Sequence, residues 1–120
     1  EFRRVLFRSL ENASKQEPEM HVDRHGTKLW YLHGELHRDD GPAIEYANGS
    51  KMWYLHGKRH RENAPATEYA NGDKEWWLNG RDYDDVEDWA KAVLKMHNKP
   101  TTPDDVQRFL RTIYKKRSLL

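Results

Sequence analysis

The sequence predicts a mainly β protein with α structure at its C-terminus, in which an antiparallel β-meander of 23-residue hairpin units is capped by a two-helix hairpin. The first observation is a pentapeptide that recurs every 23 residues: residues 30–34 and 53–57 read WYLHG, and residues 76–80 read WWLNG. The second is a set of Asn-Gly and His-Gly pairs between strand-forming residues, and the third is a change to helical hydrophobic spacing after residue 83. A period of this length is typical of arrays in which each unit packs on the next.

The N-terminal twenty residues are excluded from the predicted fold. Residues 1–9, EFRRVLFRS, match what a common short-read sequencing adapter encodes in one reading frame. No Met precedes them, so we interpret them as an artefact and expect the natural chain to extend further at this end. Residues 10–20 are polar, lack periodicity and contain Pro18, which is typical of a linker or a disordered lead-in.

Two-residue turns set the predicted register of residues 21–83. Asn48-Gly49 and Asn71-Gly72 are typical of type I′ hairpin turns, in which both central positions need a positive φ angle. His25-Gly26, His33-Gly34, His56-Gly57 and Asn79-Gly80 predict further turns of the same length. The residue pairs predicted to lie opposite one another are Ile44 and Trp53, Tyr46 and Lys51, Trp53 and His60, Leu55 and Lys58, Trp30 and His37, and Trp76 and Tyr83.

Alternation along these strands predicts which side chains form the core. One face would carry Ile44, Tyr46 and Leu55 beside the indole rings, and the other would carry Glu45, Met52, Tyr54 and Arg59. Burial of each indole should contribute on the order of 2–3 kcal/mol at about 25 cal/mol per Å² of apolar surface. The predicted structural core consists of Trp30, Trp53, Trp76, His37, His60 and Tyr83.

The histidines allow two interpretations, a metal site and a structural role. The pairs His33 with His37 and His56 with His60 have a spacing that occurs in zinc sites. In a hairpin that turns between them, however, the two side chains of each pair point to different faces. The third unit has Asn and Tyr at the equivalent positions. We therefore interpret His37 and His60 as flat rings beside tryptophan, and we predict no metal and no cofactor.

An arginine follows each predicted core histidine, in the segments HRDDGPA and HRENAPA. Arg38 and Arg61 are expected to pair either with acids of the same loop or with an acid of the next strand. Exposed ion pairs of this kind contribute roughly 0–1 kcal/mol, so we expect them to shape the loop rather than to hold the fold. The candidate partners are Asp39, Asp40, Glu62, Glu45 and Glu68.

Residues 84–120 are predicted to form the helical cap. Asp84 and Glu87 have the spacing of a capping box at the start of a first helix, which Asn98-Lys99-Pro100 ends. Thr102-Pro103 is typical of the start of a second helix. The basic residues at the end of that helix suit its dipole, so we favour a cap over the alternative, a helix-turn-helix that binds DNA.

The units GTKLWYLHGELHRDDGPAIEYANG and GSKMWYLHGKRHRENAPATEYANG resemble the MORN-repeat family, especially its degenerate bacterial and phage variants, and the resemblance covers residues 21–83. They depart from the eukaryotic pattern by having His-Arg and a Gly-Pro-Ala turn where that pattern has His-Gly-x-Gly. The lipid binding ascribed to some MORN proteins is therefore not carried over. The resemblance implies a non-catalytic β-repeat scaffold that binds protein, such as the antitoxin of a toxin–antitoxin module or a phage accessory protein.

Composition favours protein over nucleic acid as the partner. The chain has no cysteine and no apolar run as long as a membrane span, so we predict a cytoplasmic protein without disulfides. Residues 1–9 hold three of the 21 basic and one of the 20 acidic residues, which leaves 18 against 19 and a formal charge of −1 for the rest. This near-neutral charge counts against the alternative, nucleic-acid binding through the sheet or the last helix. No nucleophile is paired with a base at a recurring position, so no catalytic residue is predicted.

A protein partner is expected on the sheet face that points away from the core. Exposed aromatic side chains next to arginine are typical of interface hot spots. The competing interpretation is that each of these side chains only packs against a neighbouring unit. The predicted partner-binding residues are Tyr31, Tyr54, Trp77, Arg59, His33 and His56.

Overall fold

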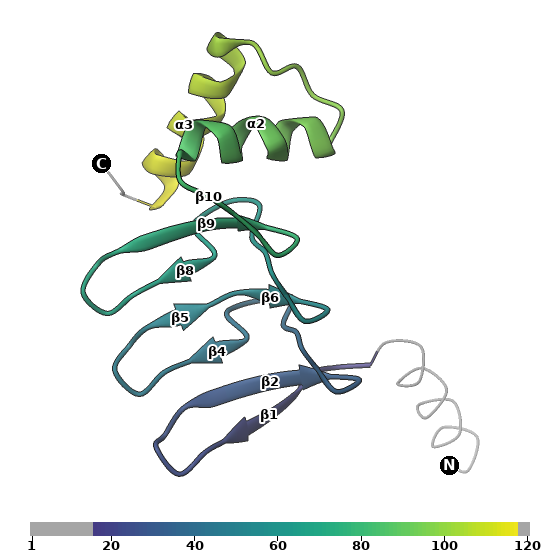
Figure 1. Cartoon of the computed structure of the whole chain (residues 1–120), viewed down its shortest axis with the longest axis vertical. Coiled ribbons are helices and arrows are strands. Elements are labelled where there is room, and N and C mark those ends of the chain that lie inside the picture. Colours follow the sequence, from purple (N-terminus) through teal and green to yellow (C-terminus); the bar gives the residue numbers. More distant parts are fainter. Residues whose placement is uncertain (1–15, 118–120) are drawn as a thin grey trace, which may run out of the picture.

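The computed structural model describes residues 16–117, which form a stack of short antiparallel strands with two helices at one end (Figure 1). The mainly antiparallel sheet and the two C-terminal helices were both predicted. The main sheet has eight strands in the order β1-β2-β4-β5-β8-β9-β10, with β3 also paired to β2, and β6 and β7 form a separate hairpin. The strands are β1 (Glu19–Val22), β2 (Lys28–Leu32), β3 (Glu35–Leu36), β4 (Ile44–Glu45), β5 (Lys51–Met52), β6 (Tyr54–Leu55), β7 (Lys58–Arg59), β8 (Thr67–Glu68), β9 (Lys74–Leu78) and β10 (Arg81–Tyr83).

The sheet begins earlier than predicted. Strand β1 starts at Glu19 and pairs with β2, so Glu19 and Met20 belong to the sheet and not to the lead-in predicted for residues 10–20. Residues 1–15, which contain the predicted adapter artefact, lie outside the described residues.

The Asn-Gly turns are longer than predicted, and the type I′ assignment at Asn48-Gly49 is wrong. The Tyr46 N–H donates to the Ser50 carbonyl at 2.9 Å, which leaves a three-residue loop in which Gly49 has a φ of 96°. The Asn48 side chain accepts the Ser50 N–H at 2.9 Å, which favours this loop over the tighter turn. The pairs Asn71-Gly72 and His25-Gly26 sit in loops closed in the same way.

The added loop residue moves the register by one. Ile44 lies opposite Met52 and Glu45 lies opposite Lys51, so the predicted pairs of Ile44 with Trp53 and of Tyr46 with Lys51 are wrong. Ile44 therefore shares a face with Met52 rather than with the indole of Trp53. On the other face the pairs continue from strand to strand as a ladder of alternating charge, in the order Lys28, Glu45, Lys51, Glu68, Lys74.

The three remaining turns are two-residue turns, as predicted. Both residues of each turn have positive φ angles, for example 52° at His33 and 78° at Gly34. The predicted pairs next to these turns are confirmed, because Leu55 lies opposite Lys58, Trp76 lies opposite Tyr83, and the His37 and His60 amides donate to the Trp30 and Trp53 carbonyls at 3.0 Å.

Imidazole rings tie each of these hairpins to the next one. His37 is buried, and its Nδ1 accepts the backbone N–H of His56 at 2.9 Å, while Nε2 lies 3.1 Å from Asp39. His60, 23 residues later, accepts the N–H of Asn79 at the same distance. Ring shape alone therefore does not explain these histidines. Tyr83 lacks such an acceptor, and a helix rather than another hairpin follows it.

The indole rings are less buried than predicted. Trp30, Trp53 and Trp76 are all of intermediate exposure. The guanidinium of Arg38 lies 3.8 Å from the centre of the Trp30 ring, and that of Arg61 lies 3.7 Å from the Trp53 ring. These stacked cations take the place that an apolar core would have in a larger protein.

The main hydrophobic core lies instead between the last hairpin and the helices. Helix α2 (Val86–Met96) begins after the N-cap Asp85, whose side chain accepts the Glu87 N–H, so the predicted cap Asp84 is off by one residue. Helix α3 (Pro103–Arg117) begins as predicted, with Thr102 accepting the Asp105 N–H. The buried residues of this core are Leu78, Trp89, Ala90, Val93, Val106, Leu110 and Ile113.

Trp89 joins the cap to the sheet. Its fully buried ring lies 4.6 Å from the Trp76 ring, where the two earlier tryptophans have an arginine, and its Nε1 donates to the Arg61 carbonyl at 3.2 Å. Glu62 adds a second link, because it pairs with His60 at 2.7 Å and with His97 of the α2 C-terminus at 2.6 Å.

Replacement of His37 by Phe should destabilise the fold by about 1–3 kcal/mol, because the ring shape is kept but the His56 N–H loses its acceptor. Urea unfolding followed by circular dichroism measures this change. Tyr83→Phe is the matched control and should change the free energy of unfolding by less than about 0.5 kcal/mol. Equal urea midpoints for His37→Phe and the parent chain would show that ring shape is sufficient.

Glu62→Gln should destabilise the protein in a pH-dependent way. Burial raises the pKa of Glu62, but the hydrogen bonds and charges of His60 and His97 outweigh it and hold this pKa below its ordinary value of 4.5. The stabilisation is therefore present above pH 4.5 and is lost as the pH falls through the lower folded-state pKa. Urea unfolding at a series of pH values should show the gap between the parent and Glu62→Gln closing in acid. The exposed control Glu17→Gln should show a constant gap, and a Glu62→Gln gap that widens in acid contradicts the assignment.

Candidate functional site

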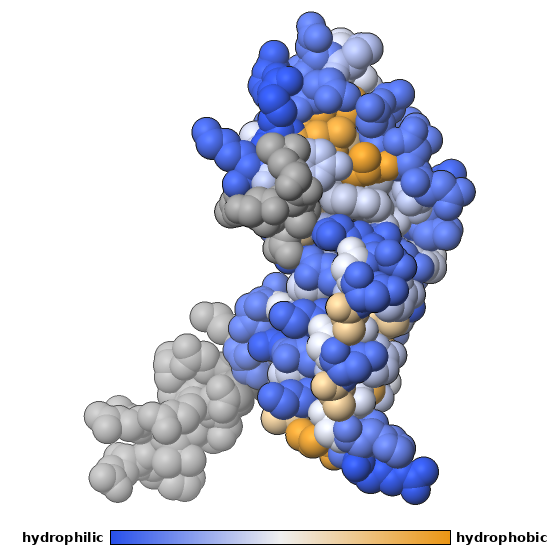
Figure 2. All heavy atoms as spheres, turned by 90° about the vertical axis from the view of Figure 1, so that its left-hand side faces the viewer, coloured by the Kyte–Doolittle hydropathy of each residue, from blue (hydrophilic) through white to orange (hydrophobic). Residues whose placement is uncertain are grey.

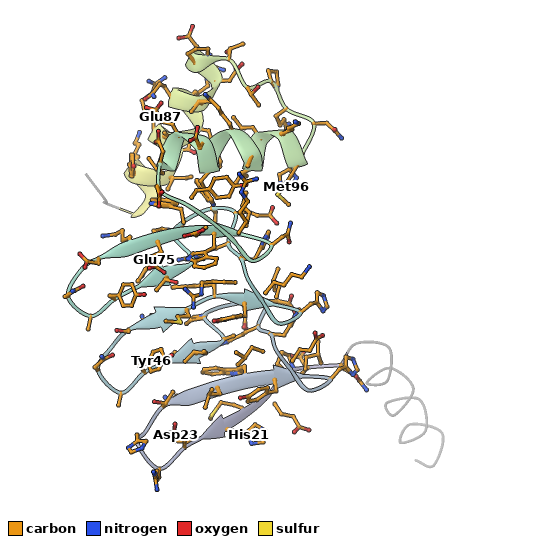
Figure 3. The ribbon with its side chains drawn as sticks, in the orientation of Figure 1. His21, Asp23, Tyr46, Glu75, Glu87 and Met96 are labelled. Carbon is orange, nitrogen blue, oxygen red and sulfur yellow. The ribbon has the colours of Figure 1, made fainter. Side chains whose placement is uncertain are left out.

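One face of the sheet gathers most of the aromatic side chains predicted to bind a partner. The cross-strand row of Leu29, Ile44, Met52, Thr67 and Glu75 defines this face, and Tyr31 joins it by alternation along β2. Figure 3 shows Tyr46 and Glu75 in successive layers of the stack. We call it the tyrosine face, which comprises Tyr31, Tyr46, Tyr54, Tyr69 and Trp77 together with Arg59 and Glu75.

Arg59 lies at the centre of the tyrosine face. Its guanidinium is 4.4 Å from the Trp77 ring and 5.5 Å from the Tyr54 ring, and its side chain is only 19% exposed. It donates to Glu75 and to the Tyr54 hydroxyl, both at 3.1 Å. Its buried Nε has no hydrogen-bond partner among residues 16–117. The structure therefore brings Tyr54, Arg59 and Trp77 together, as predicted for a hot spot, and holds them in one arrangement.

Glu75 organises the same cluster from below, and nothing in the sequence pattern indicated this role. It accepts from Arg59, from Trp77 Nε1 at 3.1 Å and from the Tyr69 hydroxyl at 3.2 Å. Burial and the neighbouring carboxylate of Glu75 raise the pKa of Tyr69. The only available signal was that Glu75 replaces Met52 and Leu29 of the earlier units, a change from apolar to charged on the same face.

The two turn histidines lie away from this cluster. His33 and His56 are exposed residues in the two-residue turns at the ends of their hairpins. The His56 ring is 4.4 Å from the His37 ring, and its backbone N–H is the group that His37 accepts. The structure thus gives His56 a link between hairpins, and whether either imidazole contacts a partner stays a prediction.

The opposite face carries the arginines whose partners were left open. Arg38 pairs with Asp40 at 3.1 Å and with Glu45 at 2.9 Å, and Arg61 pairs with Glu68 at 3.0 Å. Each guanidinium also donates to the carbonyl of the following proline. Both carboxylates of the next strand are therefore used to hold an arginine over a tryptophan. The sequence signal for this stacking was an arginine eight residues after Trp30 and Trp53.

The hollow next to this face is lined by groups that already have partners. Its lining residues include His60, Glu62 and Arg38, each of which forms one of the contacts above. Within residues 16–117, no three side chains of His, Asp or Glu come together in a way that could hold a metal ion. Neither helix of that part of the chain has the length and apolar character needed to cross a bilayer.

The fold and its face define an antiparallel β protein with a two-helix cap and one aromatic, arginine-centred surface. No family model, no curated protein and no solved structure matches the chain.

Arg59→Lys should destabilise the protein by about 1–2 kcal/mol, since an ammonium group does not stack as a plane between two aromatic rings or donate from a fixed fork. Urea unfolding measures the loss, and tryptophan fluorescence reports on Trp77. The control is Arg81→Lys, whose exposed guanidinium lies 5.0 Å from the Tyr83 ring and which should change stability by less than about 0.5 kcal/mol. Equal losses in the two variants would remove the special role of Arg59.

Proposed function

We propose that this protein is a non-catalytic scaffold of MORN-like β units that binds another protein through its tyrosine face. The arrangement of Tyr54, Arg59 and Trp77 carries the proposal. Tyrosine, tryptophan and arginine are the residue types that dominate the free energy of protein–protein binding. Because Glu75 already fixes Arg59 and Trp77, little side-chain entropy remains to be lost when a partner docks.

The charges of the opposite face favour a protein partner over a nucleic acid. Lys51 lies opposite Glu45 and Glu68, and Lys74 lies opposite Glu68, so the positive charges of the strands alternate with negative ones. Arg38 and Arg61 are held by carboxylates on the same face. A phosphate backbone needs a run of unneutralised cations, and this ladder does not offer one.

The partner class follows from the resemblance of residues 21–83 to the phage and bacterial variants of the MORN family. It is a toxin protein, bound by an antitoxin or immunity protein, or a protein of a phage particle, bound by an accessory protein. Both partners are folded proteins with surface pockets, which suits a rigid face with aromatic anchors.

Affinity capture tests the proposed function. Tagged parent chain and the double variant Tyr31→Ala with Trp77→Ala are exposed to an extract of cells that carry the gene, and the bound proteins are quantified by mass spectrometry. The parent should retain a specific protein that the variant loses by about tenfold or more, because the two aromatic anchors are removed. A binding titration with that purified protein then gives the loss in affinity.

The matched control replaces Lys28 and Lys74 by Ala, since these exposed residues lie on the same two strands but on the opposite face. Circular dichroism establishes that both variants are folded. Partner recovery that is equal for the parent and the tyrosine-face variant rejects the proposal. Salt-dependent retardation of DNA by the parent chain would favour the nucleic-acid alternative instead.

A further inference from the structure

Strand β1 is the edge of the sheet at the end opposite the helices (Figure 1). All four of its residues are exposed, and no strand among residues 16–117 pairs with its outer side. Met20 and Val22 are 48% and 57% exposed, and apolar surface is visible at this end of the molecule (Figure 2). An edge of this kind is a template for a further strand.

The outer backbone groups of β1 belong to Met20 and Val22. The Asp23 N–H donates to Thr27 of the neighbouring side, so in an antiparallel ladder His21 and Glu19 also face β2, and the residues between them face outward. The residues 23 positions later are Ala43 and Glu45, and they do pair outward: Ala43 accepts the Trp30 N–H at 2.9 Å, and Glu45 lies opposite Lys28. The geometry used at β4 is therefore available and unused at β1.

We infer that the free edge of β1 joins β1 of a second copy of this chain, around a two-fold axis, to form one continuous sheet. The opposite end cannot accept it, because β10 is paired with β9 and α2 packs on both strands. Pairing of two β1 strands uses the only open edge of each copy among the described strands, so the assembly closes at two.

Charge and hydrogen-bond geometry select one register. With Met20 opposite Met20 of the second copy, Glu19 lies opposite His21 and His21 lies opposite Glu19, which brings acids and imidazoles together. The two Met20 residues exchange both of their backbone hydrogen bonds. The Val22 N–H meets the carbonyl of Pro18, where the missing N–H of proline is not needed. The side chains of Met20 and Val22 lose exposed apolar surface at the same time.

The pairing would also join the two tyrosine faces. Glu19 lies opposite Tyr31 and His21 lies opposite Leu29, so both belong to the tyrosine face of their own copy. The His21 ring is 5.8 Å from the Tyr31 ring. Across the two-fold axis, the cross-strand rows of one copy continue into those of the other.

The full chain has no cysteine, so single cysteine variants report the register without background. Met20→Cys should form a disulfide-linked dimer under mild oxidation, because the Cα atoms of a hydrogen-bonded pair are about 5.5 Å apart. Val22→Cys is the equally exposed control and should not cross-link, since four residues of offset separate the two sites by roughly 14 Å. Light scattering of the parent chain at about 200 μM, where so small a contact is populated, should give twice the 14.4 kDa chain mass.

Met20→Pro provides an independent arm, because it removes the outward N–H while leaving the hydrogen bonds to β2 in place. It should weaken association by about tenfold or more. A parent chain that stays monomeric at 200 μM, about the upper end of the assay range, overturns the inference and leaves the edge to another strand. A dimer in which Val22→Cys cross-links as fast as Met20→Cys overturns it as well. Neither result bears on the partner captured through the tyrosine face, because Tyr31 and Trp77 are unchanged in these variants.

Discussion

The structure depends on a hydrogen bond from the backbone of a turn to an imidazole ring. Two-residue turns such as His56-Gly57 need left-handed backbone conformations, and they leave an N–H group that the turn itself does not satisfy. His37 accepts that group, and the neighbouring Gly57 N–H donates to the Leu36 carbonyl at 2.8 Å. The same two bonds recur at His60 and Asn79. Each hairpin is thereby fixed to the one before it by polar contacts of defined direction.

These contacts explain how so little apolar surface can hold a long stack. The radius of gyration is 17.5 Å, larger than the roughly 14 Å expected for a spherical domain of this length, so much of each layer stays near solvent. Arginines stacked on Trp30 and Trp53 and the alternating ladder of lysine and glutamate tolerate that exposure better than leucine would. An apolar core appears only where the helices close the stack, and Trp89 then replaces the stacked arginine.

Much of the fold could be predicted from the sequence, because turn chemistry and hydrophobic spacing are local properties. The His-Gly turns, the pairing of Trp76 with Tyr83 and the Thr102 cap follow from residues close together in the chain. The Asn48-Gly49 loop was predicted one residue too short, since the Asn side chain competes for the backbone donor and dipeptide preference does not show this. That error moved Ile44 to the wrong face. For the tyrosine face, the gathering of Tyr54, Arg59 and Trp77 was predicted, whereas the role of Glu75 depends on contacts 16 residues apart and was not. The interpretation of the histidines as flat rings failed for a related reason, because their hydrogen-bond partners lie 19 residues away.

Amide hydrogen exchange measured residue by residue tests the role of the histidines most directly. His56 and Asn79 are exposed turn residues whose amides would exchange rapidly if they contacted only water. The His33 amide, in the equivalent turn of the first hairpin, has no acceptor among residues 16–117 and serves as the internal reference. Protection of the His56 and Asn79 amides by several orders of magnitude relative to His33 is the expected result. Exchange of all three at the same fast rate would contradict the claim that imidazole rings hold the stack together.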